Sequence, residues 1–222
     1  MVLFDKIKQI IGLTSVHCLQ KLGYGKISML GKELWVPPDV FNPKFFSTSR
    51  FLAEHMNINI NDSVLDMGTG SGILAIVAGN LANNVHAVDI NPSAVLTARK
   101  NVFINGLETK IKVLESDLFD VFKKEQEKYK FEKIIFNFPY FEGVIRKKID
   151  FALYDPGKEL AEKFFKDAHN YLKENGSIYT AYSSAADIKK FHSIAENYAW
   201  RCETVAKSKF FLENIFINRF WK

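Results

Sequence analysis

The chain has 222 residues, of which 47% are apolar and 25% are charged, and it contains 20 phenylalanines. This is enough apolar material for one large packed domain, which excludes a disordered or fibrous chain. The formal net charge of +5 is scattered along the chain, which favours a solvated basic surface over a dedicated site for an anion such as RNA.

Cysteines and histidines give no sign of a disulfide framework or a metal centre. Cys18 and Cys202 lie far apart in the sequence, which favours reduced thiols in a cytosolic setting. None of the five histidines has ligand spacing with another histidine, cysteine or carboxylate. We therefore expect a cytoplasmic protein without a metal site.

The first 13 residues predict an amphipathic helix, because Leu3, Ile7 and Ile10 recur at helical intervals with lysines between them. The segment is too short and too charged to span a bilayer, and no small-residue cleavage site follows it. The sequence therefore predicts no membrane association.

A short entry segment precedes the first regular alternation of elements. Residues 26–46 mix short apolar runs with Gly31 and three prolines, which predicts a hairpin or an irregular entry. A helix is expected from about Thr48 to Met56. We expect residues 1–58 to form a helical and hairpin extension that packs on a core domain of residues 59–222.

Strands and helices then alternate. Strands are expected at 63–67, 84–89, 110–116, 133–136 and 176–183, and helices at 72–81, 92–105, 158–173 and 187–198. The tail 202–221 predicts two strands around a Glu213-Asn214 turn. The sequence thus predicts an α/β fold with a Rossmann-like, mainly parallel sheet of seven strands, helices on both faces and an antiparallel C-terminal hairpin. In such sheets, ligands bind outside the carboxyl ends of the strands.

A glycine loop follows the first strand of this sheet. The run VLDMGTGSG places Asp66 at the strand end and Gly68, Gly70 and Gly72 before the next helix, where glycines let the backbone turn tightly and approach a ligand. The dinucleotide fingerprint requires its third glycine at residue 73, which is isoleucine. The loop is therefore a poor pyrophosphate cradle, which disfavours a dehydrogenase.

Two further strands end in a carboxylate. Asp89 closes HAVD, a position suited to accept hydrogen bonds from both hydroxyls of a ribose, and Asp117 follows the next strand, where it could accept from an exocyclic amine. Singly, these residues can be explained as turn formers or helix caps. Together they fit a ligand with a ribose, a donor amine and no strong negative charge, which describes S-adenosylmethionine.

At this point the sequence resembles the class I S-adenosylmethionine-dependent methyltransferases. DMGTGSG, VDINPSA and SDLF look like the first three motifs of that family, and with ARKNVFINGL they are most similar to the small-domain group that includes the HemK-like glutamine methyltransferases. The resemblance covers about residues 35–182. It implies that S-adenosyl-L-methionine is bound by Asp66, Gly68, Thr69, Gly70, Gly72, Asp89, Ile90, Asp117, Leu118 and Asn137.

The resemblance also implies that NFPY receives the methyl acceptor, with Asn137, Phe138, Pro139 and Tyr140 as catalytic residues. A planar NH2 group is a feeble nucleophile because its lone pair is delocalised. The Asn137 side-chain carbonyl and the Phe138 main-chain carbonyl could take its two hydrogens and stabilise the positive charge that grows on the nitrogen. Tyr140 could stack on a flat acceptor, and Pro139 fixes the backbone.

NFPY departs from the HemK-like pattern Asn-Pro-Pro-aromatic at Phe138, which adds an N–H and a bulky ring beside the acceptor. Asn-apolar-Pro-Tyr looks more like the rRNA adenine dimethyltransferases. We therefore expect an N-methyltransferase that acts on a protein glutamine, or alternatively on the exocyclic amine of an RNA or DNA base. A third possibility is a non-catalytic S-adenosylmethionine-binding module in which Phe138 has closed the acceptor pocket.

Two flanking segments complete the predicted site. The stretch VPPDVFNPKFFSTS resembles the HemK-like segment that closes over the cofactor domain, with Phe41, Phe45 and Thr48 as candidate residues. After NFPY, the basic run Arg146 to Lys148 could meet phosphates, although three consecutive basic residues are more often a solvated loop. The sequence specifies neither the acceptor molecule nor the oligomeric state.

Overall fold

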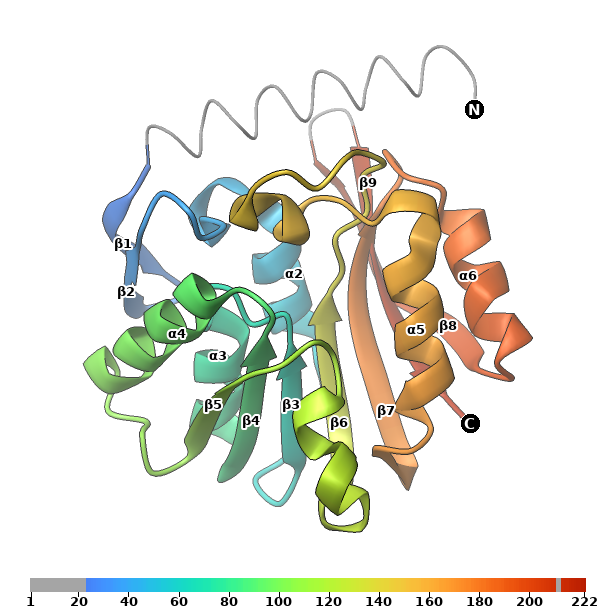
Figure 1. Cartoon of the computed structure of the whole chain (residues 1–222), viewed down its shortest axis with the longest axis horizontal. Coiled ribbons are helices and arrows are strands. Elements are labelled where there is room, and N and C mark those ends of the chain that lie inside the picture. The colour runs from blue at the N-terminus through green and yellow to red at the C-terminus, as the bar shows by residue number, and fades with distance from the viewer. Residues whose placement is uncertain (1–22, 211–212) are drawn as a thin grey trace.

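The computed structural model describes residues 23–210 and 213–222. Its centre is a twisted sheet of seven strands, with a separate two-stranded hairpin at one side (Figure 1). In spatial order the strands are β5 (Ile111–Glu115), β4 (Asn84–Asp89), β3 (Ser63–Met67), β6 (Phe131–Asn137), β7 (Leu172–Ser183), β9 (Glu213–Trp221) and β8 (Arg201–Phe210). The predicted helix within residues 1–13 lies outside the described residues.

The strand directions confirm the predicted sheet. The first five strands pair in parallel, whereas β9 is antiparallel to both β7 and β8. The β3–β6 neighbours mark the point where the strand order reverses, since β3, β4 and β5 run one way from it and β6 and β7 the other. Ligands of open α/β sheets bind at this position.

Helices cover both faces of the sheet because its strands are apolar on both sides. The five helices of the described residues are α2 (Ser47–His55), α3 (Ile73–Leu81), α4 (Pro92–Ile104), α5 (Glu159–Ala168) and α6 (Ile188–Asn197). Short 3-10 turns are η1 (Pro43–Phe45), η2 (Asp120–Lys128), η3 (Lys148–Ala152) and η4 (Pro156–Lys158). Along β3, Val64 packs with the cluster under α2, α3 and α4, and Leu65 packs with the cluster under α5 and α6. This alternation is what a strand buried on both faces requires.

Two sequence-based boundaries are wrong. Helix α5 ends at Ala168, and Leu172 and Lys173 already belong to β7, whereas the helix was expected to continue to Lys173. Glu213 and Asn214 do not form the turn of the C-terminal hairpin. They are the first residues of β9 and pair with Phe210 and Lys209. Two consecutive polar residues are typical of a turn, which is why the sequence predicted one. In the structure the pairing of β8 with β9 continues through both residues.

The hairpin of β1 (Gly25–Met29) and β2 (Lys32–Val36) is held on α4 by asparagine side chains. Asn101 is fully buried; its Oδ1 accepts a hydrogen bond from Trp35 N at 2.7 Å, and its Nδ2 donates to Trp35 O at 2.9 Å and Ser71 O at 2.8 Å. Nearer the helix end, Asn105 Nδ2 donates to Glu33 O at 2.9 Å. One amide thus joins the hairpin to the glycine loop. The predicted domain boundary at residue 58 stays a prediction.

We expect Asn101→Ala to lower the free energy of unfolding by about 2–4 kcal/mol, because two carbonyls and one N–H lose a partner in a buried place. Asn105→Ala is the matched control, since its contact to Glu33 is exposed, and its cost should be about 1 kcal/mol or less. Urea unfolding of the two variants measures both. Equal losses would show that the hairpin does not depend on Asn101.

Candidate functional site

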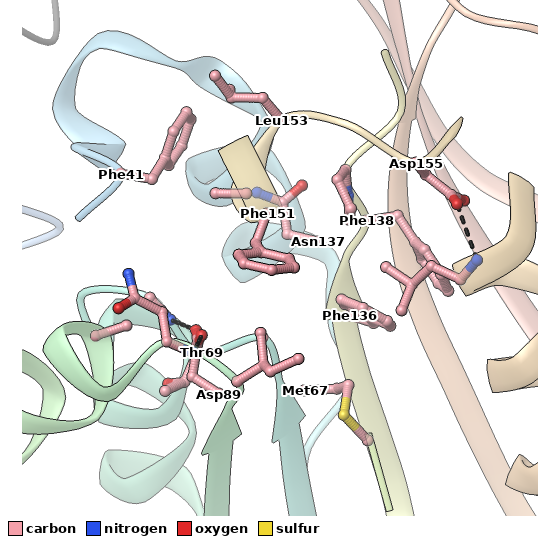
Figure 2. Close-up of a pocket in the computed structure, with 18 of the residues that line it drawn as sticks. Phe41, Met67, Thr69, Asp89, Phe136, Asn137, Phe138, Phe151, Leu153 and Asp155 are labelled. Atoms are coloured by element: carbon pink, nitrogen blue, oxygen red, sulfur yellow. Dashed lines mark hydrogen bonds between the residues drawn. The ribbon is translucent and has the colours of Figure 1, made fainter. Parts of the chain in front are cut away.

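A cavity of about 320 Å³ opens at the carboxyl ends of the parallel strands (Figure 2). Most of the residues that the sequence singles out lie on its wall, namely Gly68, Thr69, Gly70, Asp89, Ile90, Asp117, Leu118, Asn137, Phe138, Pro139 and Tyr140. Phe41, Thr48 and Lys148 also line it. Asp66, Gly72, Phe45, Arg146 and Lys147 are not among the lining residues. The wall therefore combines the glycine loop, the strand ends and the NFPY segment.

Asp66 is buried beneath the glycine loop and holds the loop by hydrogen bonds. Its side chain is completely buried, and Oδ2 accepts hydrogen bonds from Thr69 Oγ1 at 2.6 Å and from Ala75 N at 3.0 Å. Its other oxygen, Oδ1, has no hydrogen-bond partner in the described chain. Burial raises the pKa of Asp66 to about 7, against the lowering effect of its bonds to Thr69 and Ala75. The pKa of Asp66 thus lies near neutral pH.

Two glycines of the loop serve different needs. At Gly72, φ is 85°, and a Cβ would lie 3.2 Å from Ala98, so glycine lets α3 approach α4. At Gly70, φ is 55°, and a Cβ would meet nothing nearer than Gly68 O at 4.0 Å. Because Gly70 also lines the cavity, its bare backbone leaves room for a ligand beside the loop.

Asp89 connects the glycine loop to the loop after β4. Its Oδ2 accepts from Gly70 N at 2.8 Å and its Oδ1 from Asn91 N at 2.9 Å. The N–H of Ile90 also bonds to this carboxylate, and since the carboxylate has about four lone-pair sites, it can still accept a hydrogen bond from a ligand. Burial raises the pKa of Asp89, and the backbone bonds oppose this. The geometry suits the predicted bonds to two neighbouring hydroxyls.

The third strand end places an exposed carboxylate beside a constrained backbone. Asp117 is exposed and faces the cavity. Leu118 has a φ of 46°, in the left-handed region, and its carbonyl accepts a hydrogen bond from the buried Ser116 Oγ at 2.8 Å. A non-glycine residue holds this conformation only where its surroundings fix it. The loop that carries Asp117 is therefore rigidly placed.

The charged groups of the cavity wall are mostly acidic. Among the described residues it carries five carboxylates, at Asp39, Asp89, Asp117, Asp155 and Glu159, against the two ammonium groups of Lys148 and Lys163. Such a wall attracts a cation and repels a pyrophosphate. Together with the open loop at Gly70 and the acceptors at Asp89, it fits a sulfonium nucleoside such as S-adenosylmethionine.

Asn137 is the last residue of β6, and its side chain has one defined orientation. Its Nδ2 donates to Ser49 Oγ at 3.0 Å and to Thr48 Oγ1 at 3.3 Å, both at the beginning of α2. Its Oδ1 is buried and accepts no hydrogen bond within the part of the chain that the structure describes. The two hydroxyls therefore hold the NH2 end of the amide and leave its carbonyl oxygen as an unused acceptor.

The expectation that Phe138 places a bulky ring beside the acceptor is wrong. The Phe138 side chain is only 2% exposed and packs in an aromatic cluster behind the sheet. Its ring centroid lies 3.8 Å from that of Phe136, 5.0 Å from that of Phe191 and 5.1 Å from that of Phe164. Burial of so large an apolar ring among other rings outweighs any gain from turning it toward the cavity.

Tyr140 is anchored at its hydroxyl end. Its ring packs against those of Phe141 and Tyr182, with centroids 4.7 and 5.7 Å away. Burial, with the nearby Glu213 carboxyl, raises the pKa of Tyr140 above its ordinary value, while a hydrogen bond with Ser183 opposes this. Ser183 Oγ in turn donates to Glu213. Tyr140 is therefore a protonated, packing side chain and not a base.

Sequence reasoning missed two residues of this site, Ser49 and Asp155, and one residue beside it, Lys158. Ser49 was passed over beside Thr48, although a hydroxyl in the first turn of a helix is a common hydrogen-bonding group. Asp155 lines the cavity and caps α5 by accepting from Leu160 N at 2.8 Å. Lys158 is buried, with 1% exposure. The DPG turn signal marks the start of α5 but does not reveal the burial of a lysine.

No helix of the described residues is long and apolar enough to cross a membrane. In the same part of the chain, no group of three or more histidine, cysteine or acidic side chains is arranged to hold a metal ion.

Comparisons with known proteins place the chain among methyltransferases. The family model of the methyltransferase small domain matches residues 33–212. A candidate protein N5-glutamine methyltransferase of Methanocaldococcus jannaschii is 30% identical over 203 residues, which cover 88% of this chain and 98% of that protein. The tRNA (guanine(37)-N(1))-methyltransferase Trm5b of the same organism is 30% identical over 181 residues, which cover 80% of this chain and 44% of that protein.

Among solved structures, M. jannaschii Trm5 in complex with adenosine superposes with a TM-score of 0.62 and 27% identity. The match covers 88% of this chain and 55% of that one. The chain thus spans nearly all of the glutamine-methyltransferase relative but only about half of the tRNA enzymes.

We expect the stability of the protein to fall as pH rises, in part because of Asp66. Its folded pKa of about 7 lies above the value of an exposed carboxyl, so the folded state binds the proton more tightly than the unfolded state does between about pH 4 and pH 7. This stabilisation is present at low pH and is lost as pH rises through 7, by roughly 2–3 kcal/mol between pH 5 and pH 8.

Urea unfolding over this pH range, compared with Asp66→Asn, measures the effect. The asparagine carbonyl can still accept from Thr69 and Ala75, but it does not titrate. The variant should therefore show a flatter profile than the wild type, and identical slopes would contradict the assignment.

Proposed function

Because the chain belongs to the methyltransferase small domain family and is an S-adenosylmethionine-dependent methyltransferase, we propose a methyl acceptor for it. We propose that it methylates the side-chain amide nitrogen of a protein glutamine. The observation that supports the proposal most directly is that Asn137, a residue of the cavity wall, has a buried Oδ1 without a hydrogen-bond partner in the described chain. A buried acceptor without a partner costs about 1–3 kcal/mol. A substrate NH2 group that donates to this oxygen would remove that cost.

In this proposal, Asn137 and Phe138 bind the acceptor nitrogen through its hydrogens. The Asn137 Oδ1 accepts one hydrogen and the main-chain carbonyl of Phe138 accepts the other, which stabilises positive charge on the nitrogen. Thr48 and Ser49 accept hydrogen bonds from the NH2 end of the Asn137 amide, so its carbonyl is the end that is left to bind the substrate. Because the amide of Asn137 is already held by two hydrogen bonds, little reorganisation of this group is needed when the nitrogen becomes cationic.

Other residues would hold the methyl donor beside this nitrogen. S-adenosylmethionine, when bound, supplies an electrophilic methyl group. Asp89 would accept hydrogen bonds from its ribose, Asp117 would accept from its adenine amine, and Gly68 and Gly70 would let it approach the backbone. Asp66 would keep the loop in shape through Thr69. Alignment of two bound reactants of this kind can supply on the order of 7–11 kcal/mol of the barrier reduction.

A protein acceptor is favoured over a nucleic acid by two observations. The cavity wall has five carboxylates against two ammonium groups, which disfavours phosphate groups at the mouth. The glutamine-methyltransferase relative also matches over 98% of its length, whereas 44% of the tRNA enzyme is covered. The methyl-bearing product would be an N5-methylglutamine in a protein.

An RNA or DNA base is the second candidate. Arg146, Lys147 and Lys148 are exposed in the loop after NFPY, and Lys148 lines the cavity. These side chains could contact phosphates near an acceptor base. The third possibility, a non-catalytic module closed by Phe138, loses its physical basis because the ring is buried in the core.

A labelling experiment separates the two acceptors. Extract of cells that lack the protein would be incubated with purified enzyme and tritiated S-adenosylmethionine, and then divided between RNase, DNase and protease treatment. We expect the label to survive both nucleases and to be lost with protease, and the labelled peptide to carry one methyl group on glutamine. Label lost with a nuclease would reject the protein proposal.

We expect Asn137→Ala to lower the rate of methyl transfer by on the order of 10²- to 10³-fold, because one preorganised partner of the reacting nitrogen is removed. The Kd for S-adenosylmethionine, measured by calorimetry, should change only a few fold. Ser49→Ala should lower the rate less, by about 3- to 30-fold, because the amide of Asn137 keeps its weaker bond to Thr48. Unchanged activity of the Asn137 variant would show that the acceptor binds elsewhere.

A further inference from the structure

Lys158 is a buried lysine in an unusual backbone conformation. Its side chain is 1% exposed, and its φ of 68° lies in the left-handed region that favours glycine. It follows Gly157 directly and occupies the N-cap position of α5, where a lysine side chain accepts no hydrogen bond from the helix. A strained conformation persists only where the surrounding contacts fix it. The contacts of the ammonium group supply that explanation.

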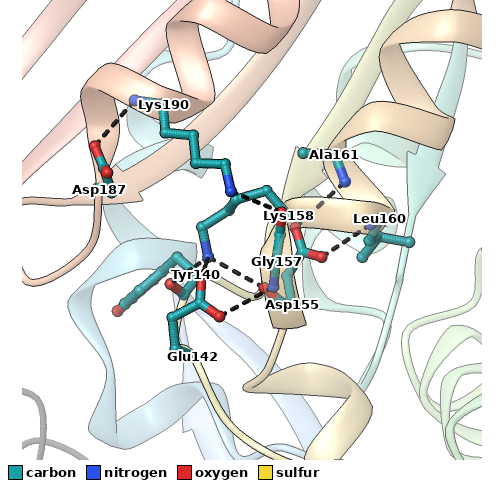
Figure 3. Close-up of polar contacts among 9 residues, drawn as sticks. All are labelled: Tyr140, Glu142, Asp155, Gly157, Lys158, Leu160, Ala161, Asp187 and Lys190. Carbon is teal, nitrogen blue, oxygen red and sulfur yellow. Dashed lines mark hydrogen bonds and ion pairs between the residues drawn. The ribbon is translucent and has the colours of Figure 1, made fainter.

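The ammonium of Lys158 joins the NFPY segment to the beginning of α5 (Figure 3). Nζ donates to Tyr140 O at 3.2 Å, to Glu142 Oε1 at 2.9 Å and to Asp155 O at 3.2 Å. An ammonium has three hydrogens, and here each has an acceptor from a different residue. The group is therefore fully satisfied although it is buried.

The backbone beside Tyr140 is held by the same segment. Phe141 N donates to Leu153 O and Asp155 N donates to Phe141 O, each at 3.0 Å. The Glu142 carboxylate also accepts from Gly157 N at 3.0 Å. The segment that leaves NFPY thus runs alongside residues 153–158, and Lys158 donates the hydrogen bond that attaches the Tyr140 carbonyl to them.

We infer that Lys158 is a positioning residue that fixes the NFPY segment, and with it the acceptor carbonyls, against α5. The inference rests on the proposed function for its catalytic consequence. The Tyr140 carbonyl is two residues beyond that of Phe138, and only Pro139 lies between these two residues. Proline restricts one dihedral angle of this short link. Because the Lys158 ammonium holds the Tyr140 carbonyl, the Phe138 carbonyl has little freedom to move away from the acceptor nitrogen.

Lys158→Met tests this role because methionine keeps an unbranched apolar stem and removes the three donors. A displacement of about 1 Å at a reacting group can cost about 10²-fold in rate. We therefore expect kcat to fall by about 30- to 100-fold, while the Kd for S-adenosylmethionine stays within about twofold. This difference between rate and cofactor affinity would not arise from a general loss of structure, which would weaken both.

Lys190→Met is the matched control. Lys190 is exposed and donates to Gly157 O at 3.0 Å from α6, so it contacts the same turn without contacting NFPY. Its kcat should stay within twofold of the wild type. Glu142→Gln provides a second test if Lys158→Met does not fold, since the Glu142 side chain is 45% exposed. It weakens the ion pair with Lys158, and kcat should fall by about 3- to 10-fold.

Hydrogen exchange gives a measurement that does not depend on the acceptor. In Lys158→Met, amide exchange should accelerate at least tenfold in residues 140–142 and 153–158 and stay unchanged in β3 and β4. If the wild type proves inactive on protein glutamine, the proposed function fails, and this exchange result alone decides the inference. Unchanged exchange in these residues, or a kcat within threefold of the wild type where transfer is measurable, would overturn the role of Lys158.

Discussion

The fixed orientation of one side-chain amide is the constraint on which the site depends. Asn137 ends β6 at the point where the strand order reverses, and two hydroxyls at the beginning of α2 hold its NH2 end. The carbonyl end is then left without a partner in the described chain. In the proposed function, this orientation makes Asn137 an acceptor for the NH2 group of a substrate.

The remaining parts of the site are arranged around that amide by tying segments that are distant in the sequence. Asn101 joins the hairpin to the glycine loop, Asp89 joins the glycine loop to β4, and Lys158 joins NFPY to α5. Each tie is a polar side chain whose partners are mainly backbone atoms. These hydrogen bonds resist a displacement of one segment along another, because a hydrogen bond weakens steeply when its distance or angle changes. Apolar packing depends less on direction and would allow such a displacement. Loops that would otherwise move are thus held at one edge of a rigid sheet.

The sequence predicted the fold well because its signals were local. Alternating apolar runs and glycine or proline punctuation located the strands and helices, and Asp89 and Asp117 could be placed at one edge by topology alone. The prediction of a turn at Glu213 was wrong because polar residues at the end of a strand resemble the residues of a turn. Ser49 and Lys158 could not be identified from local signals, since their roles depend on β6 and on Glu142, which are distant in the sequence. The direction of the Phe138 ring depended equally on residues from α5 and α6.

The placement of Phe138 also bears on how its motif can vary. Phe138 is a residue of the cavity wall, and its ring belongs to the aromatic cluster that it forms with residues of α5 and α6. Packing in the interior of the fold therefore limits which side chains fit at this position, whereas the main-chain carbonyl proposed to bind the acceptor is common to every residue type. A proline at this place stiffens the chain covalently, whereas a phenylalanine immobilises it through packing. The residue type at position 138 consequently depends on the packing of the neighbouring core and says little about the substrate.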